Sequence, residues 1–146
     1  HQNLLLTGPC GSGKTYLACA LAHTACMKGF SVKYYRLSRL LLALRQAKAD
    51  GTYSKLLIHL AKQDLLILDD WGLEPLDTAQ RNDVMEIMDD RNDARSTIII
   101  SQLPVDQWHQ SIGDNTLADA ILDRLVHNAH RMPLKGASLR QLQPES

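Results

Sequence analysis

The sequence has little that would draw it to a strongly charged or apolar partner. Its 146 residues carry sixteen basic and sixteen acidic side chains, so their formal charges cancel. No global field attracts the chain to nucleic acid or to a membrane surface, and any such binding has to be local. No apolar run reaches about 18 residues, and nothing resembles a signal peptide. The sequence therefore predicts a cytoplasmic protein without membrane contact.

Cysteine is also scarce, and its spacing excludes the common cysteine sites. The three cysteines are Cys10, Cys19 and Cys26, with no Cys-x-x-Cys pair. Cys19 and Cys26 fall on one expected helix, about 10 Å apart along its axis, which is too far for a disulfide. We expect reduced thiols that pack inside the protein. His127 and His130 come nearest to metal-ligand spacing, but no carboxylate or cysteine pattern completes a metal site.

A glycine-rich segment is the strongest feature that is present. Residues 8–15 read Gly-Pro-Cys-Gly-Ser-Gly-Lys-Thr, which matches G-x-x-x-x-G-K-[ST], between the apolar run 4–6 and an expected helix. In that setting backbone N–H groups form a nest for an anion, and the helix N-terminus adds its positive dipole end. The pattern predicts an ATP or GTP site in which Lys14 reaches the outer phosphates and Thr15 binds Mg²⁺. The expected nucleotide-binding residues are Gly8, Pro9, Cys10, Gly11, Ser12, Gly13, Lys14, Thr15 and Tyr16.

A second apolar run, 65–68, ends in two carboxylates, Asp69 and Asp70. This is typical of a buried parallel strand whose carboxyl end faces a ligand crevice. We expect Asp69 to hold Mg²⁺, directly or through water, and Asp70 to polarise or deprotonate an attacking water. The alternative is a solvated Asp-Asp-Trp-Gly turn, which the glycine loop upstream disfavours.

The rest of the chain alternates between strands and helices, which predicts a parallel α/β sheet covered on both faces. Gly29 is expected to end the first helix and Ser38 to cap the second. We expect strands at 3–7, 31–36, 65–69, 96–102 and 129–134, and helices at 14–28, 38–50, 54–63, 78–92, 104–111 and 115–127.

Two polar residues outside these motifs are candidates for the same site. Gln102 follows an apolar strand and would sense the γ-phosphate or the attacking water, unless it only leads into the turn at Pro104. Arg124 is expected near the rim of the protein. It would complete the ATP site of a neighbouring subunit, or else pair with Asp123 or Asp119 on the surface.

Basic side chains cluster along the second expected strand and the helix after it, with tyrosines between them. Lys33, Arg36 and Arg39 are the candidates for contact with a DNA phosphate backbone. Arg45 and Lys48 fit a solvated helix face equally well.

Taken together, these segments resemble one protein family. Beyond the glycine loop, the stretches Asp-Asp-Trp-Gly-Leu at 69–73 and Leu-Asp-Arg-Leu-Val-His-Asn-Ala-His at 122–130 closely resemble the IstB-like ATPases. These are AAA+ helper proteins of insertion-sequence transposons, related to the bacterial helicase loader DnaC. The resemblance implies an AAA+ P-loop NTPase core over residues 1–138, with a five-stranded parallel sheet of order 5-1-4-3-2. We expect 139–146 to be a disordered or truncated tail, and the natural N-terminal region to be missing.

The resemblance also implies a function. It indicates a bacterial, Mg²⁺-dependent ATP hydrolase that binds duplex DNA, recruits and stimulates a partner transposase, and assembles into a homo-oligomer with ATP sites at subunit boundaries. By position, Asp69 binds Mg²⁺, Asp70 activates water, Gln102 is the first sensor and Arg124 the arginine finger. Many AAA+ proteins have Glu and Asn where this chain has Asp70 and Gln102. The alternatives are a DnaC-like helicase loader, or a nucleotide-gated DNA scaffold whose hydrolysis is incidental.

Overall fold

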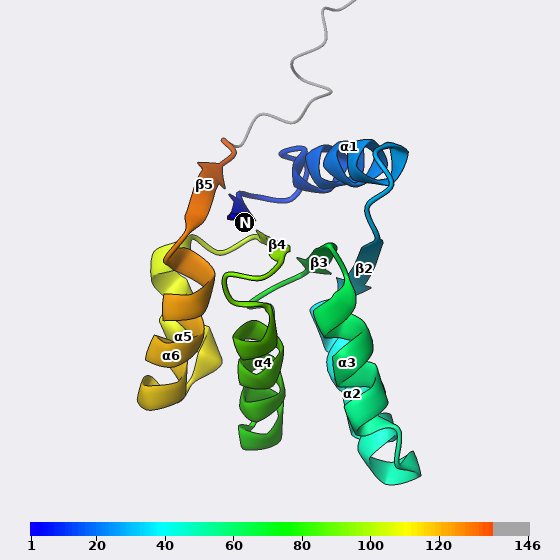
Figure 1. The fold of residues 1–146 in the computed structure, drawn as a ribbon. Helices are drawn as coiled ribbons and strands as arrows, with labels where there is room; N and C mark the ends of the chain where they lie inside the picture. Colours follow the sequence, from blue (N-terminus) through cyan, green and yellow to red (C-terminus); the bar gives the residue numbers. More distant parts are fainter. Residues whose placement is uncertain (136–146) are drawn as a thin grey trace, which may run out of the picture.

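Strands and helices alternate along the chain and build one open sheet with helices on both faces (Figure 1). The computed structural model describes residues 1–135, so the expected tail at 139–146 lies outside the described part. The strands are β1 (Asn3–Thr7), β2 (Val32–Arg36), β3 (Leu65–Asp69), β4 (Ser96–Ser101) and β5 (Ala129–Pro133). The helices are α1 (Lys14–Met27), α2 (Leu37–Asp50), α3 (Tyr53–Lys62), α4 (Thr78–Arg91), the 3-10 turn η1 (Val105–Gln107), α5 (Trp108–Ile112) and α6 (Asn115–Val126).

The five strands are parallel and lie in the order β2-β3-β4-β1-β5, which confirms the expected order. Strand β4 therefore separates β1, which leads into the glycine loop, from β3, which ends at Asp69. Strand β2 lies at the edge beside β3, and the register sets Arg36 opposite Asp69. Because all strands are parallel, the segments that follow them meet at one edge of the sheet.

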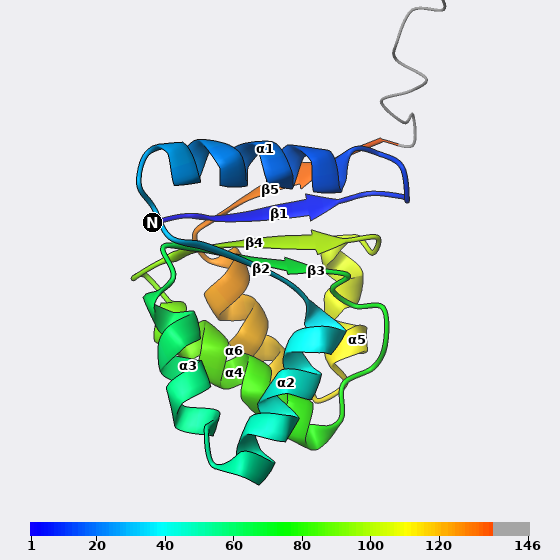
Figure 2. The same ribbon diagram turned by 90° about the vertical axis from the view of Figure 1, so that its right-hand side faces the viewer.

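The two faces of the sheet are covered unequally. Figure 2 shows α1 on one face and α2 to α6 on the other. Side chains alternate between the faces of a strand, so Leu5 packs in the larger core with the five-helix layer while Leu6 packs against α1. Only Lys14 and Ala18 of α1 are buried. The core that supports the polar edge is therefore mainly on the side of α2 to α6.

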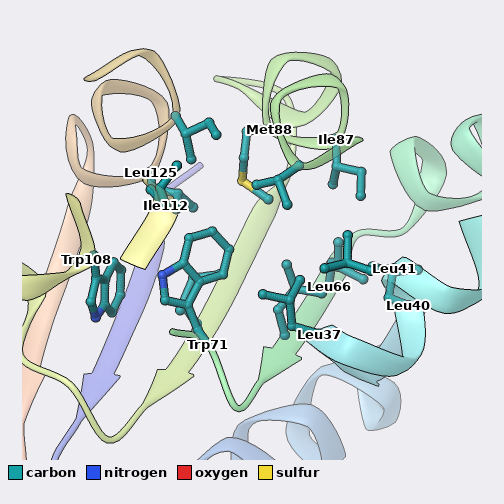
Figure 3. Packing of buried hydrophobic residues seen from close by; sticks show 14 of the residues in the cluster. Leu37, Leu40, Leu41, Leu66, Trp71, Ile87, Met88, Trp108, Ile112 and Leu125 are labelled. Atoms are coloured by element: carbon teal, nitrogen blue, oxygen red, sulfur yellow. The ribbon is translucent and has the colours of Figure 1, made fainter. Parts of the chain in front are cut away.

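Trp71 and Trp108 anchor two loops of this edge in the larger core (Figure 3). Their ring centroids are 5.6 Å apart with the planes tilted by 48°. The Trp71 backbone N–H donates to Ile100 O at 3.0 Å, and the Trp108 indole N–H donates to Leu103 O at 2.9 Å. The loop that carries Asp70 is thus fixed by a buried aromatic side chain directly after it.

Three local expectations were wrong. Ser38 does not cap the second helix, because α2 begins at Leu37, immediately after β2, with Arg36 as its N-cap. The helix expected at 104–111 is divided into η1 and α5. The cysteines are free, as expected, but all three are exposed rather than packed. Cys19 and Cys26 lie on α1, which turns most of its surface to solvent. Gly29, with φ +87°, does follow the end of α1.

Candidate nucleotide-binding site

A cleft of about 630 Å³ opens at the carboxyl edge of the sheet. It brings together the glycine loop after β1, the start of α1, the end of β2, the acid pair after β3 and the end of β4. Its lining residues are Cys10, Gly11, Gly13, Lys14, Thr15, Tyr16, Tyr34, Arg36, Asp69, Asp70, Ile100, Ser101 and Gln102. The two sequence motifs and Gln102 therefore share one cavity.

Two glycines give the loop its shape. Gly8 has φ +147°, and a Cβ there would lie 2.5 Å from Leu134 O, so a side chain has no room. Gly13 has φ +93° and is the N-cap of α1. Since glycine has no side chain, it leaves the first N–H groups of α1 open to an anion that enters the cleft.

Lys14 lies folded into the loop that it is expected to serve. Its Nζ donates to Gly8 O at 2.6 Å and to Pro9 O at 2.8 Å, and the residue is 7% exposed. Burial lowers the pKa of Lys14 from its ordinary value, while Cys10, Asp69 and Asp70 act in the opposite direction. A phosphate oxygen is a stronger acceptor for an ammonium than a peptide carbonyl, so the observed bonds can be exchanged for bonds to a phosphate.

The two carboxylates have different surroundings. Asp69 is buried and accepts a hydrogen bond from the Tyr34 hydroxyl. Burial, followed by this hydrogen bond and the nearby negative charges, raises the pKa of Tyr34 to about 12, so its phenol stays a donor at neutral pH. Asp70 has φ +58°, in the left-handed region, and its N–H donates to Asp69 Oδ1 at 2.7 Å. Such a backbone is uncommon outside glycine and occurs often at functional sites.

Arg36 pairs with the second acid. Its Nε lies 3.6 Å from Asp70 Oδ2, with side chains 62% and 33% exposed. The ion pair is therefore open to solvent and easily exchanged for another partner. Tyr34 and Arg36 lie two residues apart on one face of β2, which is why both reach the acid pair.

Ser101 joins the loops that follow β3 and β4. Its buried hydroxyl donates to Trp71 O and accepts from Leu103 N–H at 3.1 Å. The next residue, Gln102, is exposed and lines the cleft. Gln102 thus directly follows the carboxyl end of β4, between the glycine loop and the acid pair.

Arg124 lies at the amino edge of the sheet, where the strands begin, and the cleft lies at the carboxyl edge. Arg124 is in the last turn of α6, and the amide of Asn3, the first residue of β1, donates to Arg124 O at 3.4 Å and to Leu125 O at 3.1 Å. The glycine loop follows the other end of β1, so the two positions are separated by about 15 Å of strand.

The Arg124 side chain pairs with Asp89 of α4, at 2.6 Å, and not with Asp123 or Asp119. Both partners named from the sequence were therefore wrong.

The other basic residues lie on the edge strand β2 and on α2. Lys33 and Arg39 are exposed and do not line the cleft. Lys48 pairs with the buried Asp83 at 2.8 Å and lies over the Tyr53 ring. Lys48 therefore joins α2 to α4 through the buried Asp83 and is not a free cation.

The donor set fits a magnesium ion that binds with a nucleotide. Thr15 and Asp69 line the same cleft. No group of three or more His, Cys, Asp or Glu side chains in residues 1–135 forms a metal site from protein atoms alone. Mg²⁺ usually takes one or two protein oxygens and completes its shell with phosphate oxygens and water, so this sparse set suits it.

Sequence reasoning missed the contacts of Tyr34 and Arg36 with the acid pair. The signal was available in the expected strand order, because a strand next to β3 must end beside Asp69 and Asp70. Asp89 could not have been found in this way, since its contact depends on how α4 packs against α6.

In the described part of the chain, no helix is both long and apolar enough to cross a membrane.

Comparison with known proteins agrees with this geometry. The chain matches the family of IstB-like ATP binding proteins over residues 1–146. It is 57% identical over 143 residues to an insertion-sequence protein of Sinorhizobium fredii named for ATP binding, covering 98% of this chain and 58% of that protein. It is 35% identical over 139 residues to a similarly named IS21 protein of Pseudomonas aeruginosa, covering 95% of this chain and 52% of the relative. The chain thus spans little more than half the length of these relatives.

Solved structures show the same fold. The DnaC helicase loader superposes with a TM-score of 0.77 at 25% identity, covering 92% of this chain and 78% of that one. AMPPCP-bound DnaA from Aquifex aeolicus gives a TM-score of 0.77 at 19% identity, covering 95% and 41%. The sheet order and the loop, acid pair and cleft at its carboxyl edge are those of an AAA+ core, and the chain belongs to the IstB-like ATP-binding proteins of insertion sequences.

Proposed function

We propose that this chain is the ATP-hydrolysing core of a transposition helper, which assembles on target DNA and recruits and stimulates a partner transposase. The observation that carries the proposal is that one cleft holds the phosphate loop, two carboxylates and Gln102. Family membership supports ATP binding and the link to insertion sequences. Hydrolysis, DNA binding and transposase recruitment are our inferences from these findings.

Each group in the cleft has a role in this proposal. The loop N–H groups and Lys14 bind the phosphates, and Thr15 with Asp69 holds Mg²⁺, which neutralises phosphate charge when bound. Tyr34 keeps the Asp69 carboxylate oriented. Asp70 accepts the proton of the attacking water, and Gln102 orients that water or the γ-phosphate. Asp70 would exchange its solvent-exposed contact with Arg36 for the attacking water when it takes that proton.

Arg124 acts on a neighbouring protomer in this proposal. It lies about 15 Å of strand away from its own phosphate loop, and a guanidinium at that edge is available to a second copy. There it would stabilise the charge that develops on the γ-phosphoryl oxygens. The protein would then assemble head to tail, with each ATP site completed by the next protomer.

Mixing two inactive variants of the full-length protein tests the shared site. Lys14→Ala should lose tight ATP binding, while Arg124→Ala should keep ATP affinity and lose turnover. In the mixture, the intact ATP site of the Arg124→Ala protomer meets the intact arginine of the Lys14→Ala protomer, so hydrolysis should return. If Arg124→Ala alone stays fully active, the residue is only a surface ion pair and the shared-site proposal fails.

A second experiment separates the helper ATPase from a nucleotide-gated scaffold. Single-turnover hydrolysis is measured with and without duplex DNA, and transposase capture is measured with ATP and with a non-hydrolysable analogue. Stimulation by DNA supports the helper ATPase. If the hydrolysis rate is the same with and without DNA, and the analogue-bound protein captures the transposase fully, the scaffold is favoured.

A further inference from the structure

The Arg124 guanidinium is held on one side and left open on the other. Its Nε donates to Asp89 Oδ1 at 2.6 Å, and its Nη1 donates to Ala120 O at 3.0 Å, one turn back on α6. Within residues 1–135, the Nη2 group donates to no protein acceptor. A guanidinium has five N–H donors in a planar fork, so these two bonds fix its plane and leave donors for an acceptor from outside the chain.

The backbone around Asp89 is held in place by the packing of α4 against α6. Asp89 lies in the last turns of α4, which packs beside α6. Met88 of α4 and Leu125 of α6, the immediate neighbours of Asp89 and Arg124, are 3% and 0% exposed in the same core. The backbone on both sides of the ion pair is therefore fixed by buried side chains, while the pair itself remains at the surface.

A contribution to folding stability gives only a weak reason for this contact, because one of its partners is exposed to solvent. The Asp89 side chain is 56% exposed and that of Arg124 is 27% exposed. Exposed ion pairs add little to folding, because water competes and salt screens them. Orientation is what such a pair supplies to a side chain as long and flexible as arginine.

We infer that Asp89 is a positioning residue, which holds the Arg124 guanidinium in the orientation that meets the γ-phosphate of ATP on a neighbouring protomer. The inference rests on the proposed trans role of Arg124. Asp89 touches neither nucleotide nor metal. Its carboxylate binds Nε while Ala120 O binds Nη1, so that Nη2 is left for the acceptor.

The test uses full-length protomers mixed in pairs. The reference pair is Lys14→Ala with Arg124→Ala, in which only the Lys14→Ala protomer donates an arginine. Adding Asp89→Ala to that donor should lower the recovered kcat about tenfold or more, with KM for ATP unchanged, because the acting arginine is misplaced. Adding Asp89→Ala to the Arg124→Ala protomer should change nothing, because that protomer donates no arginine.

Matched controls exclude a general effect of charge or folding. Asp90→Ala in the donor removes the same charge one residue away and should leave the recovered rate unchanged. Asp89→Glu in the donor should restore part of the rate. Unfolding curves and assembly size show that each donor folds and assembles.

Two results would overturn the inference in different ways. If the reference pair recovers and donor Asp89→Ala matches it or exceeds it, Asp89 does not position Arg124. If the reference pair itself recovers no hydrolysis, the shared site fails, and the role of Asp89 falls with it.

Discussion

Asp70 combines a left-handed backbone with an ion pair at the cleft. It has φ +58° and pairs with Arg36, while Asp69 beside it is buried against Tyr34. We predict that Asp70→Asn keeps ATP·Mg²⁺ binding and slows hydrolysis about a hundredfold or more, since only the group that takes the proton is altered. Equilibrium nucleotide binding and single-turnover hydrolysis measure the two effects separately. Equal losses of both would mean that Asp70 is also a metal ligand.

The Tyr34 hydroxyl gives a second test at this scale. Removing it as Tyr34→Phe leaves Asp69 without its side-chain donor, and we expect Mg²⁺-dependent nucleotide binding to weaken about tenfold. Because the pKa of Tyr34 is raised to about 12, the loss should be the same from pH 6 to 9. Magnesium titrations at several pH values measure it. Tyr35→Phe is the control, since Tyr35 packs against the core on the other face of β2.

Among the elements, the ends of α3, α4 and the start of β4 are joined by one buried side chain. Arg91 is 2% exposed and donates to Leu60 O and Gln63 O at 2.7 Å each, to Ser96 O at 2.6 Å and to Thr97 Oγ1 at 3.0 Å. Burial lowers its pKa to about 10, which leaves the guanidinium charged at neutral pH.

We predict that Arg91→Met destabilises the fold by about 3 kcal/mol, because two buried carbonyl groups and one partly buried carbonyl group each lose a hydrogen bond from the guanidinium. Urea unfolding of this variant and of Arg95→Met gives the comparison, since the Arg95 side chain is 41% exposed and near the same edge. A loss as small as that of Arg95→Met would show that water replaces the guanidinium. Arg91→Lys should recover only part of the stability, as one ammonium cannot span all four acceptors.

At this scale, the apolar runs predicted the three central strands, β1, β3 and β4, because a parallel strand buried on both faces needs them, whereas the edge strands β2 and β5 have mixed and largely exposed sequences. Leu65 to Leu68 is such a run, and the resemblance to a known family supplied the strand order. The start of α2 was missed because β2 passes into the helix without a connecting loop. Ser38 therefore lies inside the first turn of α2 and cannot be its N-cap. The partner of Arg124 was missed because it belongs to α4, which is distant in sequence.

For the whole molecule, the zero net charge of this chain means that the DNA binding proposed above would have to rely, within these residues, on a local group of cations. Arg39 is exposed, whereas Arg36 is already paired with Asp70. We predict that Arg39→Ala in the full-length protein lowers the log–log salt slope of duplex binding by about 0.9 with ATPase activity in the absence of DNA unchanged. Arg36→Ala should change both, since it also frees Asp70.

Binding titrations at several salt concentrations measure these slopes. Arg95→Ala, at the opposite edge of the sheet, should leave the slope unchanged. If Arg39→Ala also leaves it unchanged, the DNA contacts belong to another part of the full-length protein.

The two edges of the sheet also set the symmetry of any assembly that shares ATP sites as proposed. The cleft is at one edge and Arg124 at the other, so the contact is heterologous and the row of protomers has a direction. A closed ring of n protomers would hold n complete sites, whereas an open row would hold n − 1. The two ends of the open row would also differ. At one end the cleft would lack the arginine of a neighbour, and at the other end Arg124 would have no neighbouring cleft. A transposase that recognises either end would then be recruited once per assembly and on one side only, whatever the length of the row.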